Sequence, residues 1–227
     1  MREIILDTET TGLSPADGHR VIEIGALEVV NRMPTGRTYH QYINPEREIE
    51  ATATRVHGIT NAKVSSMPVF AEIIEPFLDF VGDSPIVAHN ARFDMNFLNH
   101  ELRLADRPEL ANEVVDTLTI ARQAFPGAQV SLDALCRRYE IDLSGRTYHG
   151  ALLDANLLAM VYLELTGGQQ PGLLLDAEDD SRVSYKPTQP QPARSFPASA
   201  AEVAAHQAFI GGIEDNLWGI TPAEDGL

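Results

Sequence analysis

The sequence has almost no cysteine and very little lysine. Cys136 is the only cysteine among 227 residues, so no disulfide can form within the chain and no zinc site can be built from several cysteines. Only two lysines stand against 15 arginines, which disfavours Schiff-base chemistry. We expect Cys136 to be a core thiol beside Leu135 on a short helix.

Positive charge and long apolar runs are also scarce. The chain has 17 basic and 33 acidic residues and a formal charge of −16, which excludes the usual basic footprint of a nucleic-acid-binding domain and a polybasic membrane surface. No run approaches the ~18 apolar residues of a membrane span. The first residues, Met1 to Asp7, place an acid where a signal peptide needs its apolar stretch. We therefore expect a cytoplasmic protein.

The composition changes near Gly167, and this change suggests three parts. Residues 1–166 have the pattern of a folded domain, within a chain that is 44% hydrophobic. Residues 167–200 read as a disordered linker, because the stretch from Ser184 to Ala200 holds four prolines and little that could be buried. Residues 201–227 form a tail in which Ala201 to Gly211 is expected to be a short helix.

Strand and helix patterns alternate through the first part. The expected strands are Glu3–Asp7, Val21–Val30, Arg37–Ile43, Pro85–His89 and Val114–Val115. The expected helices are 68–81, one capped by Asn90 and ending at Leu104, one ending at Phe125, one capped by Ser131 and ending at Tyr139, and 150–165. Strands that begin as a hairpin and then alternate with helices indicate an α/β fold, a mixed sheet flanked by helices.

Acidic side chains gather at the end of the first strand. Asp7 and Glu9 are two residues apart, so they share one face of the strand while Thr8 points the other way. Two neighbouring carboxylates repel each other unless a cation lies between them or one is protonated. Hard cations such as magnesium prefer such oxygen ligands.

Two further segments carry the same chemistry. Asp94 lies in the first turn of a helix that follows a buried strand, near the positive end of the helix dipole. Asp154 lies on the last helix of the domain among leucines, where an acid is usually paired or metal-bound. Positions five apart on a helix diverge by about 140°, so His149 can share a site with Asp154 only from outside the helix, and Gly150 permits that.

Together these segments resemble a known family. D-x-E-T-T-G, then H-N-x-x-F-D, then H-G-x-x-x-D-A, in this order, resemble the DEDDh branch of the 3′–5′ exonucleases over residues 2–166. Three shorter segments are also similar in sequence to the proofreading subunits of bacterial replicative DNA polymerases. They are Val21–Ala26, Val56–Ile59 and Ser131–Cys136. The resemblance implies a ribonuclease H-like fold whose five-stranded sheet starts with three antiparallel strands and continues with parallel ones.

The resemblance also implies roles for single residues. Asp7, Glu9, Asp94 and Asp154 would hold two Mg²⁺ or Mn²⁺ ions, and His149 would be the general base on the attacking water. Such a pair of ions acts on both the attacking and the leaving oxygen of a phosphodiester, and the products would be nucleoside 5′-monophosphates. Besides Asp7, Glu9 and Asp154, the residues matching the pocket for the terminal nucleotide are Thr10, Thr11, Leu13, Val56, His57, Asn90 and Phe93.

The tail suggests protein partners. Trp218 is the only tryptophan and lies beyond the proline-rich stretch, and tryptophan is enriched among interface hot spots. Within the resemblance, residues 201–227 would bind the polymerase catalytic subunit, and Gln169 to Leu174 would offer a weaker contact to the sliding clamp. The other apolar anchors of the tail are Phe209, Ile210, Ile213, Leu217 and Ile220.

Two other functions stay open from the sequence. A DEDDh ribonuclease that trims RNA 3′ ends would carry the same catalytic residues, although a freestanding trimmer does not need the tail. A non-catalytic scaffold of the replication machinery would be expected to have lost a catalytic residue, but all five are present. The net charge of −10 over residues 1–166 would repel free DNA, so affinity would have to come from the ions, the pocket and tethering to a partner.

Overall fold

The computed structural model describes residues 1–144, 148–167 and 197–213. The chain divides into two compact units, Met1–Leu174 and Leu175–Leu227, and each is described by itself. No helix in the described ranges is long and apolar enough to cross a membrane.

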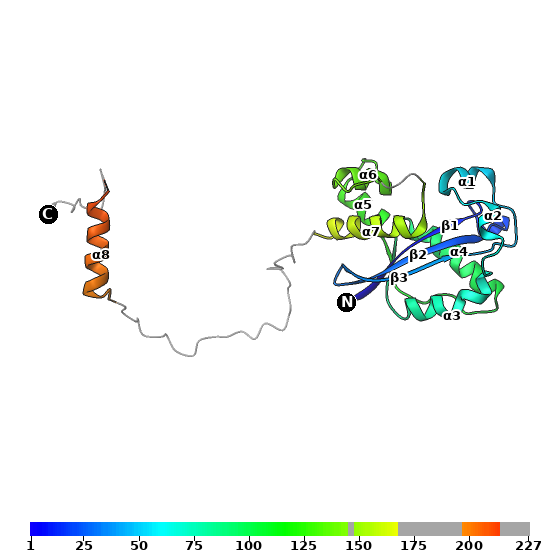
Figure 1. The fold of residues 1–227 in the computed structure, drawn as a ribbon, viewed down its shortest axis with the longest axis horizontal. Helices are drawn as coiled ribbons and strands as arrows, with labels where there is room; N and C mark the ends of the chain where they lie inside the picture. Colours follow the sequence, from blue (N-terminus) through cyan, green and yellow to red (C-terminus); the bar gives the residue numbers. More distant parts are fainter. Residues whose placement is uncertain (145–147, 168–196, 214–227) are drawn as a thin grey trace. The chain divides into compact units, whose positions relative to one another are not determined.

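A five-stranded mixed sheet forms the centre of the first unit (Figure 1). Its strands are β1 (Arg2–Thr10), β2 (Val21–Val30), β3 (Met33–Tyr42), β4 (Ile86–Ala88) and β5 (Val114–Asp116). The order across the sheet is β3-β2-β1-β4-β5. β2 is antiparallel to β1 and β3, whereas β4 is parallel to β1 and β5 is parallel to β4. The predicted fold class is therefore confirmed.

Helices cover both faces of this sheet (Figure 1). Their bounds are η1 (Pro15–Asp17), α1 (Ala51–His57), α2 (Asn61–Val64), α3 (Phe70–Val81), α4 (Ala91–Leu104), α5 (Thr117–Ala124), α6 (Leu132–Arg138) and α7 (Ala151–Leu165). Side chains of β1 alternate between the two layers: Ile4 packs in the core with α3 and α4, and Ile5 packs in the core with α7. Cys136 is buried as expected, in the cluster between α5, α6 and α7.

The β2–β3 hairpin is tighter than the sequence predicted. We expected turn residues up to Gly36 and a strand from Arg37, but β3 begins at Met33, which pairs with Val30. Asn31 and Arg32 form the turn with φ values of 51° and 66°, the backbone conformation that two-residue hairpin turns require. β3 is an edge strand, and an edge tolerates the Pro34 and Gly36 that suggested a loop.

The sequence analysis did not predict the helices α1 and α2. α1 has the sequence ATATRVH, with β-branched residues and no side-chain cap, and α2 is only four residues long. Both lie near the end of β1 that carries the acidic residues (Figure 1). Gly58 caps the C-terminal end of α1, and its φ of 69° suits a glycine at a helix terminus.

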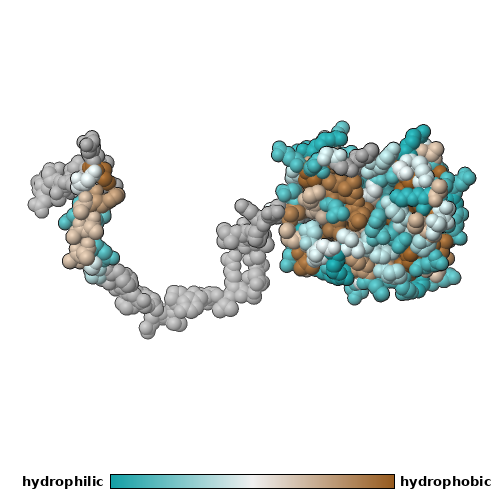
Figure 2. All heavy atoms as spheres, viewed as in Figure 1, coloured by the Kyte–Doolittle hydropathy of each residue, from teal (hydrophilic) through white to brown (hydrophobic). Residues whose placement is uncertain are grey.

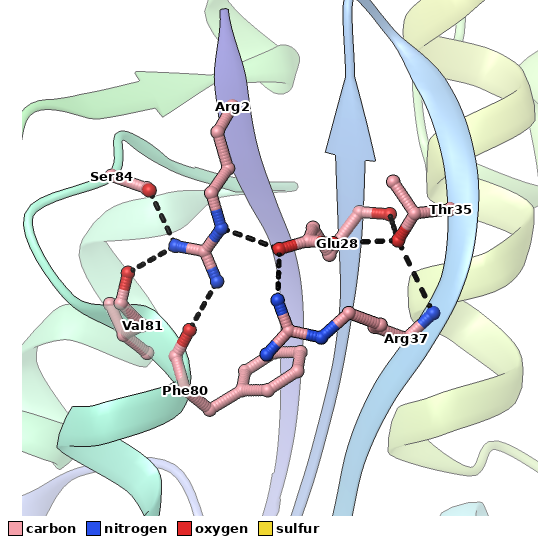
Figure 3. Close-up of polar contacts among 7 residues, drawn as sticks. All are labelled: Arg2, Glu28, Thr35, Arg37, Phe80, Val81 and Ser84. Atoms are coloured by element: carbon pink, nitrogen blue, oxygen red, sulfur yellow. Dashed lines mark hydrogen bonds and ion pairs between the residues drawn. The ribbon is translucent and has the colours of Figure 1, made fainter.

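The opposite end of β1 is fastened by Arg2 (Figure 3). Its guanidinium donates to Glu28 Oε1 at 2.6 Å, to the carbonyl oxygens of Phe80 and Val81, and to Ser84 Oγ. Arg37 and Thr35 donate to the same carboxylate, each at 2.8 Å. This network, which we call the Glu28 cluster, joins three strands to the end of α3, whose last carbonyls it satisfies.

The second unit contains the predicted short helix. α8 spans Ala200–Gly211 and begins with a capping box in which Ser199 and Glu202 exchange hydrogen bonds. None of its residues is buried, and Phe209 is 70% exposed. The linker up to residue 196, the segment 169–174 and the anchors Leu217, Trp218 and Ile220 lie outside the described residues.

Candidate active site

The end of β1 brings Asp7 and Glu9 to one face of the sheet, as the alternation predicted. Thr8 points to the other side, where its hydroxyl donates to Asp94 Oδ1 at 2.7 Å. Asp94 is 2% exposed in the first turn of α4. One hydrogen bond thus fixes the carboxylate of α4 against the strand that carries the other two acids.

The start of α4 is held by a residue that the sequence analysis missed. Asn90 occupies the N-cap position as predicted, but it has a φ of 66° and its side chain makes no cap hydrogen bond. Asp116 does this instead: its Oδ1 accepts from the N–H of Asn90 at 2.9 Å and from that of Leu118 at 3.0 Å. Asp116 therefore caps both α4 and α5. In sequence it reads as the end of a short strand, and only the parallel pairing of β4 with β5 places it beside Asn90.

His149 and Asp154 approach the acids from α7. His149 precedes the helix, as predicted, and its Nδ1 lies 3.2 Å from Asp154 Oδ2. Asp154 is 3% exposed, whereas 45% of the His149 side chain is exposed. A ligand atom from each of Glu9, His149 and Asp154 falls within 4.8 Å of the others, a spacing that suits a metal ion.

Mutual repulsion marks this group of acids. Burial raises the pKa of Asp7 well above its usual value, and the charges of Asp94, Glu9 and Asp154 raise it further. Burial also raises the pKa of Asp94, to about 7, although the hydrogen bond from Thr8 opposes this shift. Buried carboxylates that repel one another are the hard oxygen donors that divalent cations prefer, so the residues present fit such an ion.

Glu23 is a further buried acid that the sequence analysis did not single out. It lies opposite Glu9 on β2 and is 2% exposed. Its Oε2 accepts from the N–H of Ala151, the first residue of α7, at 3.1 Å, and its Oε1 lies 2.6 Å from His40 Nε2. Gly25, next on the same face, leaves no room for a Cβ, which would come within 2.1 Å of Leu152 N. Glu23 and Gly25 together seat the start of α7 on β2.

The residues expected to form a nucleotide pocket divide into buried and exposed ones. Thr10 and Thr11 are buried: the Thr10 hydroxyl donates to Gly12 O, and the Thr11 hydroxyl accepts from the N–H of Arg20. Phe93 is half-buried and its ring lies 4.9 Å from that of Phe97. Leu13, Val56 and Asn90 are exposed.

His57 differs from the other pocket candidates in its chemistry. It is 5% exposed, its Nδ1 accepts from the N–H of Ile59, and its buried Nε2 has no hydrogen-bond partner among the described residues. Burial lowers its pKa, although Glu23 opposes the shift. A neutral ring with Nδ1 as acceptor carries its proton on Nε2, which is shielded from solvent.

Comparison with known proteins identifies the family to which this fold belongs. Residues 4–162 match the family model described as Exonuclease. The chain superposes on exonuclease X in complex with 5′-overhanging duplex DNA with a TM-score of 0.59 and 28% identity, over 72% of this chain and 90% of that one. It shares its fold with the nuclease domain of 3′hExo, a DEDDh family member bound to rAMP, with a TM-score of 0.64 at 20% identity, over 73% and 91% of the two chains.

Curated relatives narrow the class further. The fold and the family match define a 3′–5′ exonuclease. DNA polymerase III subunit epsilon of Rickettsia felis is 55% identical over 174 residues, which cover 75% of this chain and 76% of the relative. The subunit of the same name from Escherichia coli K12 is 43% identical over 223 residues, which cover 92% of each. The chain belongs to the exonuclease family that includes these epsilon subunits.

Proposed function

We propose that this exonuclease removes mispaired 3′-terminal nucleotides during DNA replication, as the proofreading subunit of a replicative polymerase. The observation that carries the proposal is the crowding of Asp7, Glu9, Asp94 and Asp154 at the end of β1, with His149 at its edge. The relatives named as polymerase III subunits favour DNA over RNA as the substrate.

The four acids are the residues that would hold divalent cations. Asp7 and Glu9 supply oxygens from β1, Asp154 from α7, and Asp94 directly or through water from α4. Two such ions, magnesium or manganese, would stabilise the negative charge that develops on the attacking and leaving oxygens of a phosphodiester. The Thr8 hydroxyl donates to Asp94 Oδ1 and so holds this carboxylate against β1.

His149 is the general base in this proposal. Its position before the first turn of α7 lets the ring approach a water without leaving Asp154, whose carboxylate lies 3.2 Å away. Histidine is the side chain that most often serves as a general base at neutral pH. The exposed part of the ring faces the solvent from which the water comes.

The terminal nucleotide would lie beside the acids. Leu13, Val56, Asn90 and Phe93 offer side-chain surface to a base or sugar, and the buried His57 follows Val56 at the end of α1. Thr10 and Thr11 support this pocket from inside, because their hydroxyls are engaged within the loop.

The tail would deliver the enzyme to its substrate. Polar residues cover most of the visible face of the nuclease unit, whereas α8 is mostly apolar (Figure 2). Val203, Phe209 and Ile213 are exposed, which suits burial against a partner. We place the polymerase contact in residues 201–227, with 167–200 as a tether that raises the local concentration of the nuclease. Residues 169–174 are the weaker candidate for a clamp contact.

A primer annealed to a template strand tests the exonuclease activity. With Mg²⁺ or Mn²⁺, a 5′-labelled primer should shorten one nucleotide at a time and release nucleoside 5′-monophosphates. A mismatched terminus should react faster than a paired one, because it costs less to separate. An RNA primer of the same sequence is the control. Faster digestion of the RNA would favour a ribonuclease, and full activity in excess EDTA would contradict the metal mechanism.

A second experiment tests the tail. Removing residues 201–227 should leave digestion of short single-stranded DNA unchanged and abolish co-purification with the polymerase catalytic subunit. Trp218→Ala should weaken that binding by about 2 kcal/mol if it is a hot spot. Equal binding by the full and the truncated chain would exclude this role.

A further inference from the structure

His149 is attached to the end of α1 through its backbone. Its N–H donates to Val56 O at 3.2 Å. Val56 belongs to the last turn of α1, a helix that lies far from residue 149 in the sequence. The segment before α7 is therefore not held by α7 alone.

Tyr148, the residue before His149, contacts the same end of α1. A Cβ built on Gly58 would lie 3.0 Å from Cγ and 3.2 Å from both Cδ atoms of Tyr148. Nearly equal distances to these three atoms mean that the face of the ring lies over the Gly58 backbone. Gly58 also has a φ of 69°, so both its conformation and this close approach favour glycine.

The position of the Tyr148 ring is not explained by burial of the side chain in the core. The residue is 56% exposed, so one side of its ring rests on Gly58 and much of the rest faces solvent. A ring fixed on one side restricts the backbone dihedrals of its own residue, which directly precedes His149. On the far side, the N–H of Ala151 is fixed by Glu23. His149 thus lies between two attachments that involve neither of its ring nitrogens.

We propose that the end of α1, at Val56 and the following Gly58, is the seat that positions His149, and that Tyr148 is the positioning residue that holds the segment there. The inference rests on the proposed role of His149 as general base. Tyr148 acts through the backbone of its neighbour, and its ring, not its hydroxyl, is the part required. A displacement of a catalytic group by about 1 Å can cost about 10²-fold in rate.

Four variants of the full chain test this proposal, assayed on a short single-stranded DNA with Mg²⁺. Tyr148→Ala should lower kcat by roughly 10- to 100-fold with KM within about twofold. Tyr148→Phe keeps the ring and should restore the wild-type rate. Gly58→Ala should lower kcat similarly, whereas Gly127→Ala, at a φ of +78° with nothing within 4 Å of its Cβ, is the matched control for backbone strain alone and should stay within about twofold.

The outcomes separate this inference from the proposed function. His149→Ala is the reference: if it keeps the wild-type rate, the general-base role is wrong and the inference falls with it. If His149→Ala is inactive but Tyr148→Ala has the wild-type kcat, the positioning role of Tyr148 is wrong. The role of His149 as general base is then unaffected. A rise in KM alone for Tyr148→Ala would make the ring a substrate contact and would likewise overturn the positioning role.

Discussion

The two ends of β1 hold buried acids in opposite ways. At the amino end, Glu28 on β2 is 5% exposed and is hydrogen-bonded by Arg2, Thr35 and Arg37, and the hydrogen bond from Arg2 lowers its pKa. At the carboxyl end, burial and neighbouring acids raise the pKa of Asp7. A compensated carboxylate stabilises a fold, whereas crowded carboxylates cost stability until a cation joins them. The proposed active site thus lies at one end of the strand, and a stabilising network of hydrogen bonds lies at the other.

The largest effect should follow from removing Asp7. Asp7→Ala should reduce exonuclease activity to background, because Asp7 is one of the proposed cation ligands. Arg2→Met at the opposite end is the matched control and should leave kcat within about twofold at a temperature where it is folded. A gel assay of 3′-end digestion compares the two, and equal losses would show that the two ends do not differ in function.

The two ends should also differ in their pH dependence. The pKa of Asp94 is raised to about 7 in the folded state from 3.8, so the metal-free protein should lose stability as the pH rises from about 4 to 7. Asp94→Asn should flatten this slope and gain on the order of 4 kcal/mol at pH 8. Urea unfolding in metal-free buffer at several pH values measures this change in the free energy of unfolding. The lowered pKa of Glu28 has the opposite sign, and its contribution is lost only as the pH falls below about 4.5.

The Glu28 cluster should matter for stability alone. Arg2→Met removes four side-chain hydrogen bonds, including two to the last carbonyls of α3, and should lower the free energy of unfolding by about 2 kcal/mol. Thermal unfolding measures the loss. Arg103→Met, which breaks the exposed pair with Glu109, is the control and should change stability by less than about 1 kcal/mol. An equal loss in both variants would mean that the cluster is no stronger than a surface pair.

The smallest effect is expected at Glu23, which links the acidic end to α7. Glu23→Ala removes the acceptor for the Ala151 N–H and should cost about 1 kcal/mol of activation free energy, roughly a fivefold lower kcat. Glu23→Gln keeps an acceptor oxygen and should retain most of the rate. If both variants lose activity equally, the charge of Glu23 and not its hydrogen bond is what the site needs.

The sequence predicted the elements whose periodicity is strong and the acids that follow them. β2 was predicted with its observed bounds, and α7 to within a residue, because their apolar patterns are long. The candidate acids Asp7, Glu9, Asp94 and Asp154 were singled out because each lies near the end of a strand or in the first turns of a helix. The resemblance to a family added roles that spacing alone could not assign.

The features that the sequence did not predict depend on contacts between segments that are distant in the chain. α1 has no apolar periodicity, and its last turn matters because Val56 meets His149 across the fold. Asp116 caps α4 from a neighbouring strand, so the sequence assigned that work to Asn90. Glu23 reads as an ordinary polar residue of a strand, and only the docking of α7 buries it.

One calorimetric comparison tests the central claim, that the acids at the end of β1 hold the cations while His149 moves the proton. Mn²⁺ is titrated into the wild type, His149→Ala and Asp7→Ala. His149→Ala should bind Mn²⁺ as the wild type does while losing about 10²- to 10⁴-fold in rate, and Asp7→Ala should lose both binding and activity. If His149→Ala loses Mn²⁺ affinity as severely as Asp7→Ala, His149 is a metal ligand and the division of roles is wrong.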